Sequence, residues 1–372
     1  MKRRNFINQT GGLAALGLVG SALSACRPQQ SGQSECGPLS EPGKPEFKWK
    51  MVTAWPRDFP GLGTGANKLA DYIQRLSGGR IAVKIYGGGE LIPPFEVFDA
   101  VSRGTAELGH GASYYWKGKI PAAQIFAGVP FGLTSQEQNA WLYYGGGLEL
   151  WQEAYAEFGV IPFPVGSSGT QMGGWFNREI NSVDDLVGLK MRIPGLGAEV
   201  LKRAGGTPTT IPGAELFTAL QTGTIDATEW IGPYNDLAFG LFRAAKYYYY
   251  PGWHEPGTTL ELTVNSAAFS ELPEDLQAIV EIASQAANMD MLSEFTARSG
   301  PSLQRLIDEH RVELRQFPAA VLKKLSGLTA EVIADLAASD DHSARAHQSM
   351  TDFYQQVRDW TAISDYNYLT SR

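Results

Sequence analysis

The chain has 372 residues, of which 43% are hydrophobic and 19% are charged, and its formal net charge is −8 at pH 7. This length and composition exclude a disordered or collagen-like chain and allow one or two packed cores. The acidic balance argues against nucleic acid as a partner. Two cysteines, and five histidines without an HxxxH pair, disfavour a disulfide framework and a structural zinc site.

Residues 1–25 are typical of a signal peptide. A basic head at residues 2–4 precedes an uncharged, mostly small and apolar stretch at residues 11–25, which suits export but is short for a membrane span. The stretch ends in Leu-Ser-Ala-Cys26, which resembles the lipobox of bacterial lipoproteins and implies a lipid on Cys26. The alternative is an ordinary signal peptide with a chance cysteine. The paired arginines leave Sec and twin-arginine export open.

Residues 26–46 are predicted to form a flexible tether between the lipid anchor and the body. The segment contains Pro, Gly, Ser, Gln and Glu with one leucine, so it buries too little apolar surface to offset the entropy of ordering. Cys36 within it has no assigned role, although a disulfide to Cys26 can form if lipidation fails.

The body begins with predicted strands and helices in alternation. Strands are expected at residues 47–53 and 80–86, and helices at residues 66–76 and 95–102. This order predicts an α/β fold with a mostly parallel sheet under helical covers.

An internal repeat suggests that the body has two similar lobes. Residues 98–108, FDAVSRGTAEL, recur as FTALQTGTIDA at residues 217–227, and both copies read as a helix stopped by glycine before a strand. Chance similarity between two helix ends is the alternative. Apolar extended runs at residues 159–165 and 255–264 are predicted to cross between the lobes as a hinge.

From Pro273 onward the pattern is helical, ending in a helix that contains residues 353–360. These helices are expected either to brace both lobes or to pair with a second subunit as a homodimer. The predicted organisation is lobe 1 at 47–164 and 256–272, lobe 2 at 165–255, and long hinge-spanning and C-terminal helices at 273–372.

No motif for a known reaction is present. The glycines at residues 61–66 are spaced G-x-G-x-G, which does not match the dinucleotide fingerprint, and the chain has no P-loop, GxSxG or HExxH motif. Residues 166–257 instead combine charged groups with many aromatic side chains. This composition fits a concave site for a small polar ligand, with an aromatic core as the alternative.

Four segments in this region are similar to the substrate-binding subunits of tripartite ATP-independent periplasmic (TRAP) transporters, in particular to the branch that binds 2-oxo monocarboxylates such as pyruvate. These segments are QMGGWFNREI, GLKMR, GTIDATEWIGPY and YYYYPGW. The resemblance covers about residues 47–368. It implies a two-lobed periplasmic binding protein fold of the TRAP type, with crossing strands and a long helix behind the lobes.

The resemblance also implies a set of site residues. Arg192 matches the arginine that holds the substrate carboxylate, which a guanidinium can bind through two parallel hydrogen bonds. A cation site is implied at Gln171, Glu229, the backbone carbonyl of Trp230, and Glu255. Oxygen ligands suit a hard cation, with sodium favoured and calcium as an alternative, and a 2-oxo acid can complete the shell.

Aromatic side chains of the first lobe are implied to close over the ligand. Tyr114, Tyr115 and Phe131 are the candidates, and Gln171 is expected to contact the substrate as well as the cation. His254 departs from the family pattern, in which an aromatic residue would also fit. This departure leaves the pocket size open.

The expected function is that of a periplasmic, lipid-anchored receptor that captures a 2-oxo carboxylate, closes about its hinge and delivers the ligand to a TRAP membrane permease. No catalysis is expected. One alternative is an exported metal-assisted enzyme acting on a 2-oxo acid, for which His254 and Lys190 are the available bases. Another is a sensory module that serves a receptor kinase.

Overall fold

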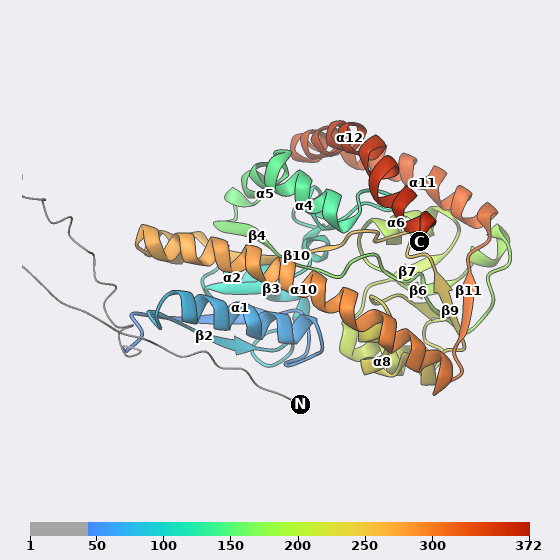
Figure 1. The fold of residues 1–372 in the computed structure, drawn as a ribbon, viewed down its shortest axis with the longest axis horizontal. Coiled ribbons are helices and arrows are strands. Elements are labelled where there is room, and N and C mark those ends of the chain that lie inside the picture. Colours follow the sequence, from blue (N-terminus) through green and yellow to red (C-terminus); the bar gives the residue numbers. More distant parts are fainter. Residues whose placement is uncertain (1–43) are drawn as a thin grey trace, which may run out of the picture. The chain divides into compact units, whose positions relative to one another are not determined.

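Two β-sheets with helical covers organise residues 44–372, the part of the chain that this computed structural model describes (Figure 1). The predicted export signal, Cys26 and Cys36 lie outside the described residues. The first sheet has the strand order β2-β1-β3-β10-β4. Its strands are β1 Phe47–Thr53, β2 Ile81–Tyr86, β3 Leu108–Gly111, β4 Val160–Ser167 and β10 Thr259–Asn265.

The second sheet has the order β11-β9-β5-β8-β6-β7. Its strands are β5 Gly174–Phe176, β6 Lys190–Arg192, β7 Thr207–Thr209, β8 Ala227–Thr228, β9 Tyr247–Tyr250 and β11 Glu313–Gln316. We call each sheet, with the helices packed on it, a lobe.

The first sheet confirms the elements predicted from local periodicity. β1 pairs in parallel with β2 and β3, whereas β10 runs antiparallel to β3 and β4. Helix α1 (Leu62–Leu76) starts earlier than predicted, because the hydroxyl of Thr64 accepts a hydrogen bond from the backbone N–H of Gly61 and caps the first turn. Leu69 and Ile73 of this helix pack with Met51 of β1 in a buried cluster.

Both copies of the internal repeat fold in the same way. A 3-10 turn precedes each copy; the first copy runs from helix α2 (Val97–Ser102) to the start of β3, and the second from helix α7 (Leu216–Gln221) to the start of β8. Each copy ends in a strand that pairs in parallel, β3 with β1 and β8 with β6. The repeat is therefore structural, and it builds corresponding parts of the two lobes.

Helix α10 (Glu274–Asp308) runs across both lobes (Figure 1). Its 35 residues span about 52 Å, and it contacts α1 and β4 in the first lobe and α8 (Pro233–Phe239) in the second. The tail after α10 is helical as expected, except that the strand β11 follows it and pairs in parallel with β9 of the second sheet.

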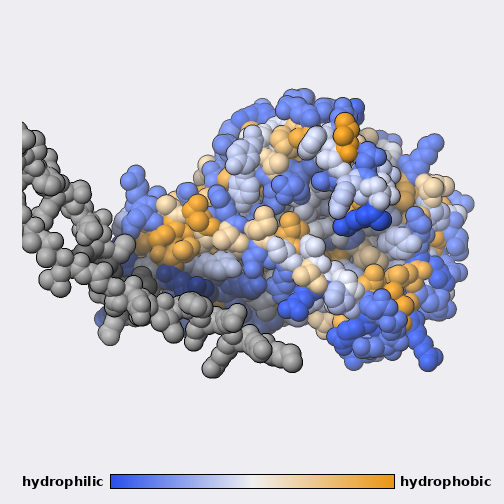
Figure 2. All heavy atoms as spheres, in the orientation of Figure 1, coloured by the Kyte–Doolittle hydropathy of each residue, from blue (hydrophilic) through white to orange (hydrophobic). Residues whose placement is uncertain are grey.

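The remaining helices cover the two sheets and form the tail. They are α3 Ala123–Ala127, α4 Ser135–Tyr144, α5 Gly147–Ala156, α6 Gly195–Arg203, α9 Ser266–Ser270, α11 Ala319–Ala337, α12 Asp341–Thr361 and α13 Asn367–Ser371. Within residues 44–372, no helix is both long and apolar enough to cross a membrane. The face drawn in Figure 2 is mostly hydrophilic, with separate apolar clusters.

Candidate binding site

A small cavity lies where side chains from the two lobes converge. Trp55, Tyr114 and Tyr115 line it from the first lobe, and Arg192 and Trp230 line it from the second. Its volume is about 10 Å³, which is room for about one water molecule. The other lining residues are Leu62, Ser168, Gln171, Ile231, Thr258 and Leu260.

Strand pairing brings Arg192 next to Glu229. Arg192 ends β6, and it lies opposite Thr228 of the parallel strand β8, so Glu229 follows at the same edge of the sheet. Both side chains are 1% exposed and form an ion pair. Arg192 Nη1 also donates to the backbone carbonyl of Glu229 at 3.2 Å. Burial of this arginine is therefore compensated by a carboxylate and a peptide oxygen.

The other arm of the guanidinium faces the first lobe. Arg192 Nη2 donates to the hydroxyl of Tyr115 over 3.4 Å, and the guanidinium carbon lies 5.2 Å from the centre of the Trp230 ring. A hydrogen bond of this length is weak. The Nη2 group can therefore donate a stronger hydrogen bond to a better acceptor, such as the carboxylate of a small ligand.

Two glutamates and a histidine form a buried group beside the arginine. One ligand atom from each of Glu229, His254 and Glu255 lies within 4.8 Å of the others. Burial, and then the charge of Glu229, raises the pKa of Glu255 to about 7. Two carboxylates at this spacing repel each other when both are ionised, so a cation between them would stabilise the ionised pair.

Gln171 contacts the same group through its side-chain amide. Its amide Nε2 donates to Glu255 Oε2 at 2.7 Å and to Thr258 Oγ1 at 3.2 Å. Its Oε1 is buried and accepts no hydrogen bond from any residue of the described range 44–372. A buried amide oxygen without a donor, on a side chain that contacts Glu255, fits the ligand set of a hard cation.

The structure brings most of the expected site residues together. Gln171, Glu229 and Glu255 meet as described, and Tyr114 and Tyr115 lie in the 3-10 turn η2 (Ser113–Trp116), which lines the cavity. Trp230 lines the cavity and donates its indole N–H to the side-chain oxygen of Asn235 at 3.2 Å.

Phe131 is placed elsewhere, in contrast to the expectation. Its backbone N–H donates to the carbonyl of Trp253 at 2.9 Å, and its ring stacks on that of Trp253 with 5.9 Å between centroids. Its positive φ of 55° turns the chain toward a different groove, which α11 and α12 also line. Phe131 therefore does not line the cavity.

The aromatic run at residues 247–250 is mainly core. Tyr248 and Tyr249 are buried, and the ring of Tyr248 stacks on Trp175 of the neighbouring strand with 4.0 Å between centroids. For these rings the packing alternative considered from composition is correct.

Sequence reasoning did not find six of the lining residues, which are Trp55, Leu62, Ser168, Ile231, Thr258 and Leu260. Trp55 follows β1, Ser168 follows β4, and Thr258 precedes β10. Trp55 is oriented by a hydrogen bond from its Nε1 to Nδ1 of His110 at 3.1 Å. Position at the carboxyl end of a parallel strand is the available signal for Trp55, because open α/β sheets bind ligands at that edge.

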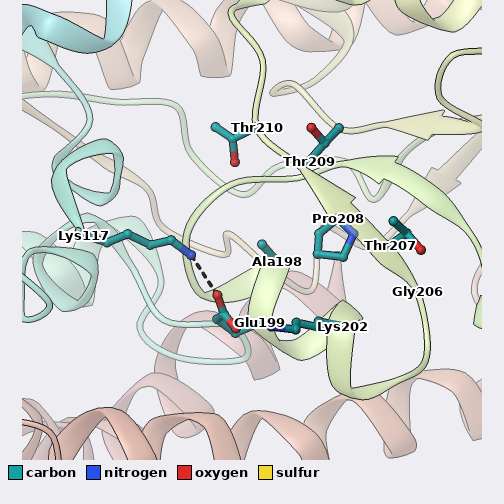
Figure 3. Close-up of a pocket in the computed structure, with 9 residues that line it drawn as sticks. All are labelled: Lys117, Ala198, Glu199, Lys202, Gly206, Thr207, Pro208, Thr209 and Thr210. Atoms are coloured by element: carbon teal, nitrogen blue, oxygen red, sulfur yellow. Dashed lines mark hydrogen bonds and ion pairs between the residues drawn. The ribbon is translucent and has the colours of Figure 1, made fainter.

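An ion pair connects the lobes outside the cavity. Lys117 follows η2 of the first lobe, and its Nζ lies 3.0 Å from Oε1 of Glu199 in α6 of the second lobe (Figure 3). The groove around this pair has a volume of about 400 Å³, and Lys202 and residues 206–210 also line it.

Two α/β lobes that enclose a polar site define a two-lobed ligand-binding protein. The sequence model of the family described as bacterial extracellular solute-binding protein, family 7 (DctP), matches residues 51–340. The chain belongs to this family. Membership confirms the expectation of a solute-binding protein rather than an enzyme.

The chain is similar to several named proteins over nearly its whole length. The chain is 40% identical over 368 residues to a monocarboxylate 2-oxoacid-binding periplasmic protein of Nostoc sp., a match that covers 99% of this chain and 98% of the relative. Two solved structures are TRAP periplasmic solute binding proteins, one from Colwellia psychrerythraea with bound calcium and pyruvate and one from Pseudoalteromonas atlantica with bound sodium and pyruvate. Each has 44% identity and a TM-score of 0.85, and covers 88% of this chain and 99% of the other. These similarities confirm the TRAP-type fold.

Proposed function

We propose that this protein is the extracytoplasmic subunit of a TRAP transporter, which captures a 2-oxo monocarboxylate such as pyruvate together with a hard cation and delivers it to the membrane permease. The observation that carries the proposal is the position of Arg192 at one interlobe cavity, where Nη1 pairs with Glu229 of the buried carboxylate group and Nη2 points at Tyr115 of the other lobe. The similar proteins with bound pyruvate and calcium or sodium support the same reading.

The chemistry assigns each group a role. Arg192 binds the substrate carboxylate, and Tyr114 and Tyr115 close over the ligand from the first lobe. The cation is held by Gln171 Oε1, the carboxylates of Glu229 and Glu255, and the backbone carbonyl of Trp230. Because a 2-oxo acid offers a carboxylate oxygen and a keto oxygen to the same ion, it chelates the cation through a five-membered ring, whereas a plain carboxylate offers only its two carboxylate oxygens.

Isothermal titration calorimetry on dialysed protein tests the proposal. Pyruvate should bind in the presence of calcium or sodium, whereas lactate, which has a hydroxyl in place of the keto group, should bind at least tenfold more weakly. Succinate and sialic acid are controls for dicarboxylates and sugar acids. Binding of only those two ligands would overturn the substrate assignment.

Closure about a hinge is part of the proposal. Lobe 1 is taken as residues 47–164 and 256–272 and lobe 2 as residues 165–255, to whose sheet the segment 273–372 adds β11, and helix α10 of that segment contacts both lobes. Strands β4 and β10 lie side by side at the edge of the first sheet and continue toward the second lobe. A ligand that touches both lobes favours the closed form by its differential affinity. Small-angle scattering should report a smaller radius of gyration when pyruvate and cation are added together.

Location and assembly complete the proposal. The protein is exported to the periplasm and anchored through a lipid on Cys26, so the Cys26→Ser variant should move from the membrane to the soluble periplasmic fraction.

Homodimer formation is supported by large apolar side chains left exposed at the end of α12 and beyond it. These are Trp360, Ile363, Tyr366, Tyr368 and Leu369. Light scattering should give twice the mass of one chain.

A further inference from the structure

Asn235 joins a residue of the ligand cavity to the opposite lobe. Its side chain lies in the first turn of α8 and is fully buried. Oδ1 accepts a hydrogen bond from the indole Nε1 of Trp230, which lines the cavity, at 3.2 Å. Nδ2 donates to the backbone carbonyl of Pro60 in the first lobe at 2.9 Å. One amide therefore connects the cavity wall of the second lobe to the first lobe.

The two partners of Asn235 fix the orientation of its amide. An indole N–H can only donate and a peptide carbonyl can only accept, so a reversed amide would place donor against donor and acceptor against acceptor. Only the observed orientation satisfies both partners. The contact therefore needs a side chain that accepts on one side and donates on the other, which an apolar side chain of similar size cannot do.

Aromatic rings pack at the same boundary between the lobes. Phe59 of the first lobe is 9% exposed, and its ring stacks on that of Phe239 in α8 with 4.2 Å between centroids. The rings of Phe59 and Phe239 both meet the Trp230 ring edge-on, with centroid distances of 6.4 Å and 5.1 Å. Trp230 is therefore held by contacts from both lobes.

The chain just before α1 closely approaches the second lobe. Gly61 has a φ of 73°, and a Cβ on it would lie 2.7 Å from the ring of Phe295 in α10 and 3.3 Å from Asn235 Nδ2. A side chain at this position would push the segment away from α8 and α10. Leu62, the next residue, lines the cavity. Separation of the lobes here would therefore open the cavity at Leu62 and break the hydrogen bond from Asn235 to Pro60.

We propose that Asn235 is a positioning residue that sets how long a bound ligand stays in the cavity, because it ties Trp230 to Pro60 of the opposite lobe. Without this amide, the indole N–H of Trp230 and the carbonyl of Pro60 would be buried and unpaired in the closed form, whereas water can satisfy both groups once the lobes separate. Loss of the amide therefore destabilises the closed form selectively, so the ligand leaves faster while entry into the open form is unaffected. The inference rests on the proposed function for the identity of the ligand.

Stopped-flow tryptophan fluorescence with pyruvate and calcium measures entry and release separately. In Asn235→Leu, which keeps a similar volume without polar atoms, the dissociation rate should rise about tenfold or more, and the association rate should change less than about threefold. The matched control is Asn288→Leu, which removes another buried amide, one that donates to Asn139 of α4 at 2.9 Å. This control should leave both rates within about twofold of the wild-type values.

The indole N–H resonance of Trp230 reports directly on its hydrogen bond to Asn235. In isotope-labelled protein this resonance is assigned by its loss in Trp230→Phe. It should move upfield in Asn235→Leu and keep its position in Asn288→Leu, which a general loss of stability would not produce.

Phe59→Leu tests the same contact from the first lobe. The smaller side chain loses the stacking on Phe239, so the dissociation rate should rise about 2- to 10-fold with little change in the association rate. This variant leaves the Asn235 amide in place, so the test stands even if Asn235→Leu fails to fold.

Three results would overturn the inference. The first is a dissociation rate within twofold of wild type in Asn235→Leu, or in Phe59→Leu where Asn235→Leu does not fold. The second is an equal rise in Asn235→Leu and Asn288→Leu, and the third is a loss of affinity that comes from slower association alone. Failure of the proposed function is distinguishable, because wild-type protein would then bind no pyruvate in calcium or in sodium, and no closed complex would exist for Asn235 to retain.

Discussion

Arg192 and Tyr115 meet across the boundary between the lobes, with Nη2 donating to the phenol oxygen over 3.4 Å. They are 77 positions apart in the chain. One arm of the guanidinium is occupied by Glu229 of its own lobe, and the other points at the opposite lobe. A carboxylate bound at Nη2 would therefore contact groups of both lobes, and ligand binding would be coupled to closure.

Arg192→Lys should weaken pyruvate binding by about 10- to 100-fold, because lysine lacks the planar fork and a charge-assisted hydrogen bond contributes about 1.5–3 kcal/mol. Calorimetry with pyruvate at fixed cation concentration measures the change. Arg203→Lys is the control, since Arg203 forms ion pairs at the surface with Glu331 and Asp335. Wild-type affinity in Arg192→Lys would exclude Arg192 as the carboxylate ligand.

Removal of the cation should weaken pyruvate binding at least tenfold. The reason is electrostatic, because Glu229 and Glu255 repel an incoming carboxylate unless a cation lies between them. Protein treated with a chelator in sodium-free, potassium-free buffer is titrated with pyruvate, and a metal ion is then restored. If the two affinities are equal, the cation has no part in ligand binding.

The exposed pair Lys117–Glu199 should slow opening of the closed form to a small extent. An exposed ion pair contributes roughly 0.2–1 kcal/mol, so Glu199→Gln should raise the dissociation rate of pyruvate by about 1.5- to 5-fold, and high salt should abolish the difference. Stopped-flow tryptophan fluorescence measures this rate. The matched control is Glu153→Gln, which breaks an exposed pair with Arg345 on the helical cover. An equal change in both variants would refute a role across the lobes.

Local periodicity predicted the elements of the first sheet but little of the second. The bounds predicted for β1 agree with those observed, because a segment of seven residues is long enough to show the period of two that is typical of a strand. β8 has two residues and β6 has three, so no period can be measured in them. β11 depends on pairing with β9, far away in the sequence, and sequence patterns do not report such long-range contacts.

The sequence predicted only part of the site, because the contacts within it join residues that are far apart in the chain. The identity of Arg192, Gln171, Glu229 and Glu255 came from resemblance, whereas the hydrogen bond between Gln171 and Glu255 joins residues 84 positions apart. The position of Phe131 could not be read from its aromatic character. It is decided by a backbone turn with φ of 55° and by the carbonyl of Trp253.

A buried carboxyl on β10 should make stability depend on pH. Glu261 is fully buried, and it accepts hydrogen bonds from Trp116 and from the hydroxyl of Tyr155, the latter at 2.9 Å. Burial raises the pKa of Glu261 to about 8 from an ordinary 4.5. The folded protein therefore holds a proton on Glu261 that the unfolded chain releases as the pH rises above 4.5.

The sign of the effect follows from proton linkage. Stabilisation by protonated Glu261 is fully present below pH 4.5 and is lost as the pH rises toward 8. The free energy of unfolding of the wild-type protein should therefore fall between pH 5 and pH 8.5. The free energy of unfolding of Glu261→Gln, whose amide does not titrate, should fall by about 1–3 kcal/mol less than that of the wild-type protein over this pH range.

Urea denaturation at pH 5, 6.5 and 8.5 measures the free energy of unfolding in both proteins. Asp236 provides an independent comparison, because burial also raises its pKa, to about 7, so Asp236→Asn should flatten the profile in the same direction. Since the two carboxyls lie in different lobes, their effects should add in the double variant. Parallel pH profiles for wild-type protein and Glu261→Gln would show that Glu261 does not hold the proton in the folded state.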